Sequence, residues 1–324
     1  MKTDLLSPTP EIVARAVELL SSGEPVALPT ETVYGLAADA INPAAVLKIF
    51  EAKERPFFDP LIVHLPDLSW LDRITQNRDL LIEKLTAKFW PGPLTFILQR
   101  REIVPDVVTS GLGTVAVRMS GHPVFREVCA KFGKPLAAPS ANRFGRISPT
   151  AAAHVLSELQ GRIPLILDGG PTAHGIESTI IAVENGCIRI LRAGPVTPEQ
   201  LAEFGEVVAE PRNDLPEAPG QLKSHYAPRT RMEILDSRTS NFDFRGRCAG
   251  LLAWTSSMRA NHYSVCEVLS PSGDLREAAA TLFAKMRRLD EAGLDLILAE
   301  PVPESGLGIA IMDRLRKAAH RNDA

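Results

Sequence analysis

Short apolar segments, each followed directly by a polar loop, constrain the possible fold of this chain more than any other feature. Each is about as long as one β-strand, and the clearest examples are residues 25–28, 114–117, 135–138 and 165–167. Amphipathic segments typical of helices, such as residues 10–22 and 43–52, lie between or before them. This alternation of strands and helices indicates an α/β fold. The loops that follow such strands are where α/β proteins commonly bind ligands.

Composition narrows the class of protein. The chain has 324 residues, of which 45% are hydrophobic and 23% charged, which is typical of a globular protein large enough for two domains. A formal net charge of −3 argues against a general affinity for nucleic acid or anionic membranes. The four cysteines form no C-x-x-C pair, so neither a disulfide framework nor a zinc site is expected. There is no signal peptide and no apolar run long enough to span a bilayer, so we expect a cytoplasmic protein.

Two cations follow the second amphipathic segment. Lys53 and Arg55 lie two positions apart, just before Pro56, and in an extended segment they would share one face. A guanidinium fork and an ammonium group on one face suit a polyphosphate. The alternative is a solvated charge pair that ends the preceding helix.

Four further polar side chains lie at expected strand ends: Thr32, Arg118, Ser140 and Arg192. Thr32 belongs to a segment with three hydroxyl groups, one acid and a glycine, which could equally be a Thr-rich strand edge, since threonine favours strands. Arg118 could bind a carboxylate or be a solvated edge charge. The segment 139–150 could contact phosphate through amides and hydroxyls, or be an ordinary loop that caps a helix. Together with Lys53 and Arg55, these groups suggest a site for a small polyanion.

The pattern changes after residue 204. Residues 205–230 are polar and rich in proline, which is typical of a linker. His225 and Tyr226 are unusual in an idle tether, so this segment either folds back as a lid or docks for packing alone. Residues 231–324 again alternate strands with helices and indicate a smaller α/β domain, in which no site is predicted.

No P-loop, protein-kinase set, G-x-S-x-G elbow or H-E-x-x-H motif is present. Several motifs in this order resemble the YrdC-like threonylcarbamoyl-AMP synthases, in their long form with a linker and a C-terminal domain. These motifs are Pro29-Thr30-Glu31-Thr32-Val33-Tyr34-Gly35-Leu36, Lys53-x-Arg55-Pro56, Pro91-Gly92-Pro93-Leu94-Thr95, Ser140-Ala141-Asn142, Ser148-Pro149-Thr150, Glu177-Ser178-Thr179, Arg192-Ala193-Gly194-Pro195 and His225-Tyr226-Ala227-Pro228.

The resemblance implies a twisted, open, mixed α/β sheet in a catalytic domain over 1–204, a lid over 205–230 and a Rossmann-like α/β domain over 231–324. It implies synthesis of L-threonylcarbamoyladenylate and pyrophosphate from L-threonine, bicarbonate and ATP, with Mg²⁺ accompanying ATP. The product would pass to the tRNA threonylcarbamoyltransferase complex, which forms N6-threonylcarbamoyladenosine in tRNA. By motif match, the ATP-binding residues would be Lys53, Arg55, Asp59, Thr114, Ser140, Asn142, Ser148, Arg192 and Tyr226. The threonine-binding residues would be Thr32, His64, Arg118 and Ser178.

Two positions depart from the family pattern. Asp59 stands where the family usually has asparagine, and an acid among phosphates is unfavourable unless it faces magnesium or a ribose hydroxyl. Phe144 stands where a small polar residue is common.

Alternative functions are an RNA-binding module, a nucleotide-binding regulator without turnover, and a carbamoyltransferase of hydrogenase maturation. The last would need acylphosphatase and zinc-finger regions, for which this chain has neither the room nor the cysteine pairs.

Overall fold

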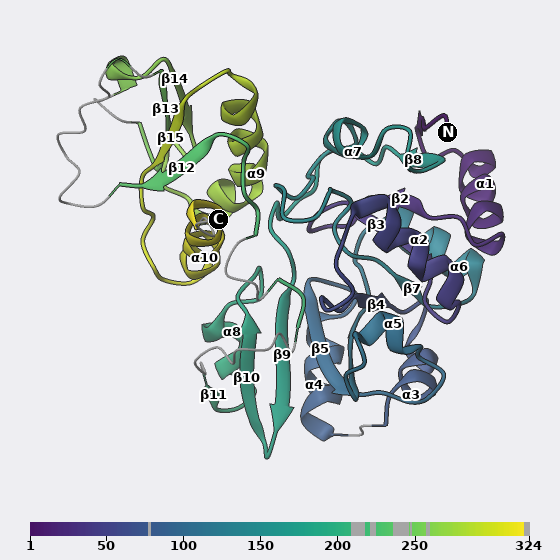
Figure 1. Cartoon of the computed structure of the whole chain (residues 1–324). Helices are drawn as coiled ribbons and strands as arrows, with labels where there is room; N and C mark the ends of the chain where they lie inside the picture. Colours follow the sequence, from purple (N-terminus) through teal and green to yellow (C-terminus); the bar gives the residue numbers. More distant parts are fainter. Residues whose placement is uncertain are drawn as a thin grey trace.

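The computed structural model describes residues 1–76, 79–208, 218–220, 225–235, 246, 248–256 and 260–320. Within these ranges the chain forms two α/β domains with one sheet each (Figure 1). The fold class expected from the sequence is therefore confirmed: a large, open, mixed sheet with flanking helices precedes a smaller α/β domain. No helix in these ranges is long and apolar enough to cross a membrane.

The N-terminal sheet has the strand order β1-β8-β2-β3-β7-β4-β6-β5-β9-β10-β11. The sheet is mixed: it contains parallel pairs, such as β4 with β6, and antiparallel pairs, such as β5 with β6. The strands are β1 (Asp4–Leu6), β2 (Val26–Leu28), β3 (Gly35–Asp39), β4 (Ile62–His64), β5 (Leu94–Gln99), β6 (Thr114–Arg118), β7 (Leu136–Ala137), β8 (Leu165–Leu167), β9 (Thr179–Glu184), β10 (Cys187–Arg192) and β11 (Val207–Val208).

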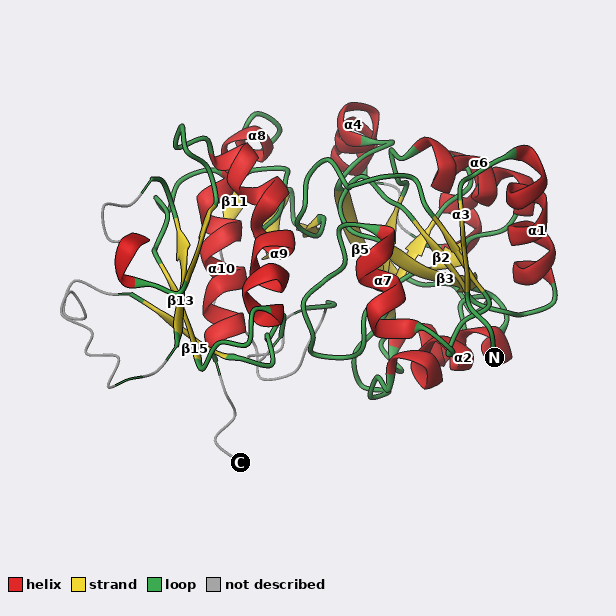
Figure 2. Ribbon diagram, turned by 90° about the horizontal axis from the view of Figure 1, so that it is seen from above, coloured by secondary structure: helices red, strands yellow, loops and turns green. Residues whose placement is uncertain are grey.

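Helices cover both faces of this sheet, with α1 and α6 on one face and α2 and α7 on the other (Figure 2). Sequence signals explain where two of them begin: Thr9 and Asn42 each cap a helix whose first residue is proline. The helices are α1 (Pro10–Ser21), α2 (Pro43–Lys53), α3 (Leu71–Ile74), α4 (Leu80–Phe89), α5 (Asp106–Thr109), α6 (Pro123–Phe132), α7 (Ala152–Leu159) and α8 (Pro198–Ala202).

The C-terminal domain has a parallel sheet in the order β12-β15-β13-β14. Its two long helices lie on the face of the sheet that is turned toward the N-terminal domain (Figures 1 and 2). The elements are β12 (Arg231–Ile234), β13 (Ala249–Ala253), β14 (Val265–Val268), α9 (Leu275–Glu291), β15 (Leu296–Ala299) and α10 (Leu307–Ala319).

One hydrophobic cluster belongs to both domains. Phe283 and other core residues of α9 and α10 pack in the same cluster as Val33, Ile147 and Ile176 of the N-terminal domain. Tyr226, from the segment between the domains, is fully buried in this cluster, and its ring centroid lies 5.4 Å from that of Phe283. The two domains and the segment between them are therefore joined by apolar packing as well as by the chain.

Gly175 of the N-terminal domain lies against helix α9 of the C-terminal domain. Its φ is +69°, and a Cβ there would stand 2.4 Å from the Ala279 carbonyl oxygen and 2.5 Å from Ala280 atoms of α9. We expect Gly175→Ala to lower the free energy of unfolding by about 2–5 kcal/mol, since left-handed strain and backbone overlap add. Urea unfolding would measure this. Gly133→Ala is the matched control, because Gly133 also has a positive φ but nothing lies within 4 Å of its Cβ position. Equal losses in the two variants would contradict the close-packing argument.

Candidate active site

A single cavity collects residues that the sequence places far apart. It holds about 50 Å³ and is lined by residues from the strand ends of the N-terminal sheet and from the segment between the domains. Seven of the thirteen predicted site residues line it: Thr32, Arg55, His64, Arg118, Ser140, Arg192 and Tyr226. The four strand-end positions predicted to form one site are thus brought together.

The parallel pairing of β4 with β6 explains part of this convergence. His64 and Arg118 are register partners at the carboxyl ends of these two strands, so both side chains reach the same edge of the sheet. His64 is buried, and its Nδ1 has no hydrogen-bond partner among the described residues. Burial and the neighbouring Arg118 charge hold the pKa of His64 well below its usual value, so the imidazole is neutral at pH 7. It can serve as a hydrogen-bonding group there and not as a cation.

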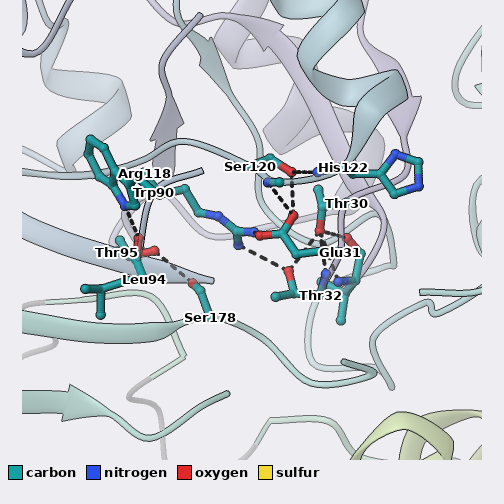
Figure 3. A network of polar contacts seen from close by, with 12 residues as sticks. Thr30, Glu31, Thr32, Trp90, Leu94, Thr95, Arg118, Ser120, His122 and Ser178 are labelled. Atoms are coloured by element: carbon teal, nitrogen blue, oxygen red, sulfur yellow. Dashed lines mark hydrogen bonds and ion pairs between the residues drawn. The ribbon is translucent and has the colours of Figure 1, made fainter. Parts of the chain in front are cut away.

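Arg118 is held by the loop that follows β2 (Figure 3). Its Nη1 donates to Thr32 Oγ1 over 3.1 Å, and its Nη2 forms an ion pair with Glu31 over 2.5 Å. The other Glu31 oxygen accepts hydrogen bonds from the Ser120 hydroxyl and the Gly121 amide. Arg118 Nε remains without a partner among the described residues. The guanidinium is therefore fixed in orientation and buried at the cavity, and it is not a solvated edge charge.

This pairing makes a prediction about pH. Burial raises the pKa of Glu31, but the Arg118 charge and the Ser120 hydrogen bond outweigh it and leave the pKa below 4.5. A lowered acid pKa gives stability that is present above the unfolded pKa and is lost as pH falls through the folded one. We therefore expect Glu31→Gln to lose less stability than the parent chain between about pH 7 and about pH 3 in urea unfolding. Glu127→Gln, which breaks an exposed pair with Lys131, should follow the parent. A parental pH slope in Glu31→Gln would contradict the pairing.

The two cations at 53 and 55 are placed differently from the extended arrangement considered above. Helix α2 continues through Lys53, and Glu54 then takes a left-handed conformation with φ 53°. Both cations are buried, at 1% and 7% exposed, so the alternative of a solvated pair is wrong. Lys53 Nζ donates to the main-chain carbonyls of Ser140 and Asn142, and thereby fixes the loop that carries Ser140 into the cavity.

Arg55 lines the cavity and is paired with Asp59, an acid that does not line it. Its Nη2 lies 2.8 Å from Asp59 Oδ2 and donates to the Pro60 carbonyl, while its Nε donates to the Asp59 carbonyl. Asp59 is fully buried, and its Oδ1 has no hydrogen-bond partner among the described residues. Burial raises the pKa of Asp59, against the opposing effect of Arg55 and Lys53. Asp59, which stands where the family usually has asparagine, thus holds Arg55 in place.

The third buried arginine of the cavity is Arg192, at the end of β10. Its Nη2 and Nε donate to the hydroxyl and the carbonyl of Ser178, each over 3.0 Å, and its Nη1 donates to the Pro219 carbonyl over 3.2 Å. The Ser178 hydroxyl also lies 2.8 Å from that of Thr95 (Figure 3). Arg192 therefore connects the N-terminal sheet to the segment that covers the cavity.

The remaining predicted residues do not line the cavity. Four of them contact a residue that does: Lys53, Asp59, Ser148 and Ser178. Asn142 lies one contact further away, because its carbonyl accepts a hydrogen bond from Lys53. Thr114 does not join the others, because it begins β6 at the end opposite Arg118. Ser148 donates to Glu177, a buried carboxylate that lines the cavity.

The segment between the domains covers the site. His225, Tyr226, Pro219 and Gly220 line the cavity, and the Ala227 amide donates to the Gly145 carbonyl over 2.8 Å. Tyr226 has a φ of 62°, and its buried hydroxyl has no hydrogen-bond partner among the described residues. The rest of the predicted lid, residues 209–217 and 221–224, lies outside the described residues, and the boundaries at 204 and 231 stay predictions.

Two functional carboxylates were missed by the sequence reasoning. Glu31 and Glu177 both stand inside quoted motifs, but neither was given a role. The available signal for Glu31 was an acid between two threonines, shortly after a short apolar strand, whereas its partner Arg118 lies 87 residues away. No such local signal exists for Glu177, whose partners Ser148 and Arg314 lie 29 and 137 residues away.

Comparison with known proteins shows the family to which the chain belongs. A family model described as telomere recombination matches residues 18–194, and one described as the threonylcarbamoyl-AMP synthase C-terminal domain matches residues 196–320. The chain is 42% identical to the threonylcarbamoyl-AMP synthase of Bacillus subtilis, with 98% of this chain and 95% of that protein covered. It is 38% identical to the enzyme of the same name from Pyrococcus abyssi, with 94% and 93% covered.

Solved structures give the same result in three dimensions. The chain is similar to P. abyssi Sua5 complexed with L-threonine, with a TM-score of 0.87 and 36% identity, over 98% of this chain and 97% of that one. Both domains and the segment between them therefore have counterparts in that structure. The chain belongs to the threonylcarbamoyl-AMP synthase family, in its two-domain form.

Proposed function

We propose that this chain joins L-threonine, bicarbonate and ATP into L-threonylcarbamoyladenylate and pyrophosphate, and so acts as a nucleotidyltransferase. The observation that carries the proposal is the convergence of Arg55, Arg118 and Arg192, all buried, on one cavity of a protein with net charge −3. Concentrated positive charge in a slightly acidic chain favours a specific small polyanion over a general nucleic-acid surface.

The cavity divides into two halves by charge and hydrogen bonding. Arg118 offers its unpartnered Nε beside Thr32 and His64, which suits the carboxylate and hydroxyl of threonine. Arg55 and Arg192, with Ser140 and Tyr226, would face the phosphates and the nucleotide. Lys53, Asn142, Ser148, Ser178 and Asp59 would hold these groups in place from behind. A contact of Thr114 with ATP, as motif match suggests, stays a prediction.

The chemistry needs no covalent nucleophile from the protein. The threonine amine would attack the carbon of bicarbonate, with loss of water, or of CO₂ derived from it, with loss of a proton, to give N-carboxythreonine. The new carboxylate oxygen would then attack the α-phosphorus of ATP, and pyrophosphate would leave. Arg55 and Arg192 would neutralise the charge that develops on the phosphates, so positioning and electrostatics supply the rate enhancement.

Mg²⁺ is proposed to arrive with ATP. Magnesium is usually held by one or two carboxylates together with substrate phosphates. The described residues bring together no group of three potential metal-binding side chains, whereas Asp59 offers one carboxylate oxygen without a partner. Asp59 would therefore be the protein's contribution to such a site.

The cavity must enlarge before substrates enter. A volume of about 50 Å³ is well below the roughly 300–1,000 Å³ typical of ligand pockets. His225, Tyr226 and Gly220 fill the space over Arg55 and Arg192. The segment between the domains would move away to admit ATP and return over it, as a lid.

Pyrophosphate release from ATP, measured with and without L-threonine in bicarbonate and magnesium, tests the proposal. Release that requires threonine, and that serine supports only weakly, is expected. Tight ATP binding without release would favour the nucleotide-binding regulator, and a gel shift with RNA but no ATP binding would favour the RNA-binding module. Transfer of the product to a tRNA threonylcarbamoyltransferase complex, and a cytoplasmic location, stay predictions.

A further inference from the structure

An arginine of the C-terminal domain contacts a residue in the wall of the N-terminal cavity. Arg314, on α10, is 0% exposed. Its Nε donates to Glu177 Oε2 over 3.1 Å, and its Nη1 donates to the Ala193 carbonyl over 2.8 Å and to Asp313 over 3.0 Å. Two of these three acceptors belong to the other domain, although 121 and 137 residues separate them from Arg314.

Glu177 is the group through which this contact reaches the site. It is 6% exposed and lines the cavity, with one carboxylate oxygen accepting from Ser148 and the other from Arg314. A buried carboxylate needs a cation or several hydrogen bonds to remain charged. Arg192 lines the same cavity and donates to Ser178, the residue next to Glu177, so without Arg314 it is the cation with which Glu177 would pair. Glu177 would then neutralise a guanidinium that ATP requires.

The same helix also contacts the segment that covers the cavity. Lys317, one turn after Arg314, donates to the Gly220 carbonyl over 2.7 Å, and its own carbonyl accepts from the His225 amide. The Arg314 guanidinium carbon lies 5.5 Å from the centre of the Tyr226 ring. Helix α10 therefore contacts both Glu177 in the wall of the cavity and the residues that cover it.

We infer that Arg314 is a positioning residue of the nucleotide half of the site: it keeps Glu177 bound to Ser148 and away from Arg192. Through it, the C-terminal domain takes part in ATP binding without touching ATP. The inference rests on the proposed function for the identity of the ligand. It predicts a selective effect, because within the described part of the chain Thr32, His64 and Arg118 of the threonine half form no hydrogen bond or ion pair with Arg314 or Glu177.

The test compares four variants of the full-length chain: Arg314→Met, Arg314→Lys, the double variant Arg314→Met with Glu177→Gln, and the control Arg316→Met. Arg316 lies on the same helix but forms an exposed pair with Glu304. Calorimetric titration would give the affinity of each for a non-hydrolysable ATP analogue and for L-threonine. Thermal unfolding would confirm that each variant is folded.

Arg314→Met is expected to weaken binding of the ATP analogue by about tenfold or more, while its affinity for threonine stays within about twofold of the parental value. The double variant should recover most of the loss, because a neutral glutamine no longer competes for Arg192. Arg316→Met should match the parent chain.

Three outcomes would overturn the inference: unchanged analogue affinity in Arg314→Met, equal losses for both ligands, or no recovery in the double variant. Should Arg314→Met fail to fold, Arg314→Lys decides the matter, since an ammonium cannot reproduce the fork to Glu177 and Ala193. We then expect Arg314→Lys to lose affinity for the analogue but not for threonine. Parental affinity for both ligands would refute the positioning role of Arg314. Failure of the parent to release pyrophosphate would refute the proposed function, while the binding comparison would still decide the role of Arg314.

Discussion

Replacement of Arg118 by methionine is expected to remove almost all use of threonine and to leave ATP binding intact. A guanidinium that binds a carboxylate through two charge-assisted hydrogen bonds contributes about 3–6 kcal/mol, at roughly 1.5–3 kcal/mol for each bond. The value of kcat/KM for threonine should therefore fall by about two to four decades. Initial rates of pyrophosphate release over a range of threonine concentrations would measure this.

The same substitution should also destabilise the fold, for a reason that can be separated from catalysis. Glu31 would remain buried without its cation, at a cost of about 3–5 kcal/mol. Combining Arg118→Met with Glu31→Gln should restore much of the stability but none of the activity. Arg126→Met, on the exposed side of α6, is the matched control. Recovery of threonine use in the double variant would show that Arg118 acts only as a structural partner of Glu31.

Replacement of Arg55 by methionine should lower kcat/KM for ATP by about one to two decades, because one charge-assisted contact to phosphate is lost. Threonine affinity should change little, since Arg55 pairs with Asp59 and Pro60 and makes no contact with the Arg118 network. ATP titrations of pyrophosphate release at saturating threonine would give this value.

Asp59 complicates the interpretation of that variant, because its carboxylate would lose its ion pair in a fully buried position. The double variant Arg55→Met with Asp59→Asn removes both charges and keeps the shape of the site. We expect it to unfold near the parental denaturant concentration and to remain defective with ATP. Parental ATP kinetics in the double variant would exclude Arg55 from the phosphate site.

The strand-end residues could be predicted because their placement follows from the fold class. Thr32, Arg118, Ser140 and Arg192 each come directly before or after a short apolar segment, and an α/β sheet gathers such positions at one edge. Thr114 rests on motif match alone: it begins the strand that Arg118 ends, so the two residues are at opposite ends of β6, and its contact with ATP stays a prediction.

Other parts of the site depend on contacts that no local pattern encodes. The conformation of Glu54 turns Lys53 away from an extended arrangement with Arg55, and the partners of Lys53 are main-chain carbonyls almost ninety residues away. Arg314 looks like an ordinary residue of an amphipathic helix until the two domains pack together. The sequence therefore predicts which strand ends converge, whereas the charge partners behind them depend on how helices and domains pack.

The hydrophobic cluster shared by both domains has a consequence for how this protein unfolds. Multidomain chains commonly melt in separate steps, one for each domain. Here Phe283 of α9 belongs to one cluster with Val33 and Ile176 of the N-terminal domain, and Tyr226 of the covering segment packs against Phe283 in it. Separating the domains would expose this apolar surface to water, together with the Arg314–Glu177 ion pair. We therefore expect the C-terminal domain and the cavity to unfold together, in one calorimetric transition whose van't Hoff and calorimetric enthalpies agree.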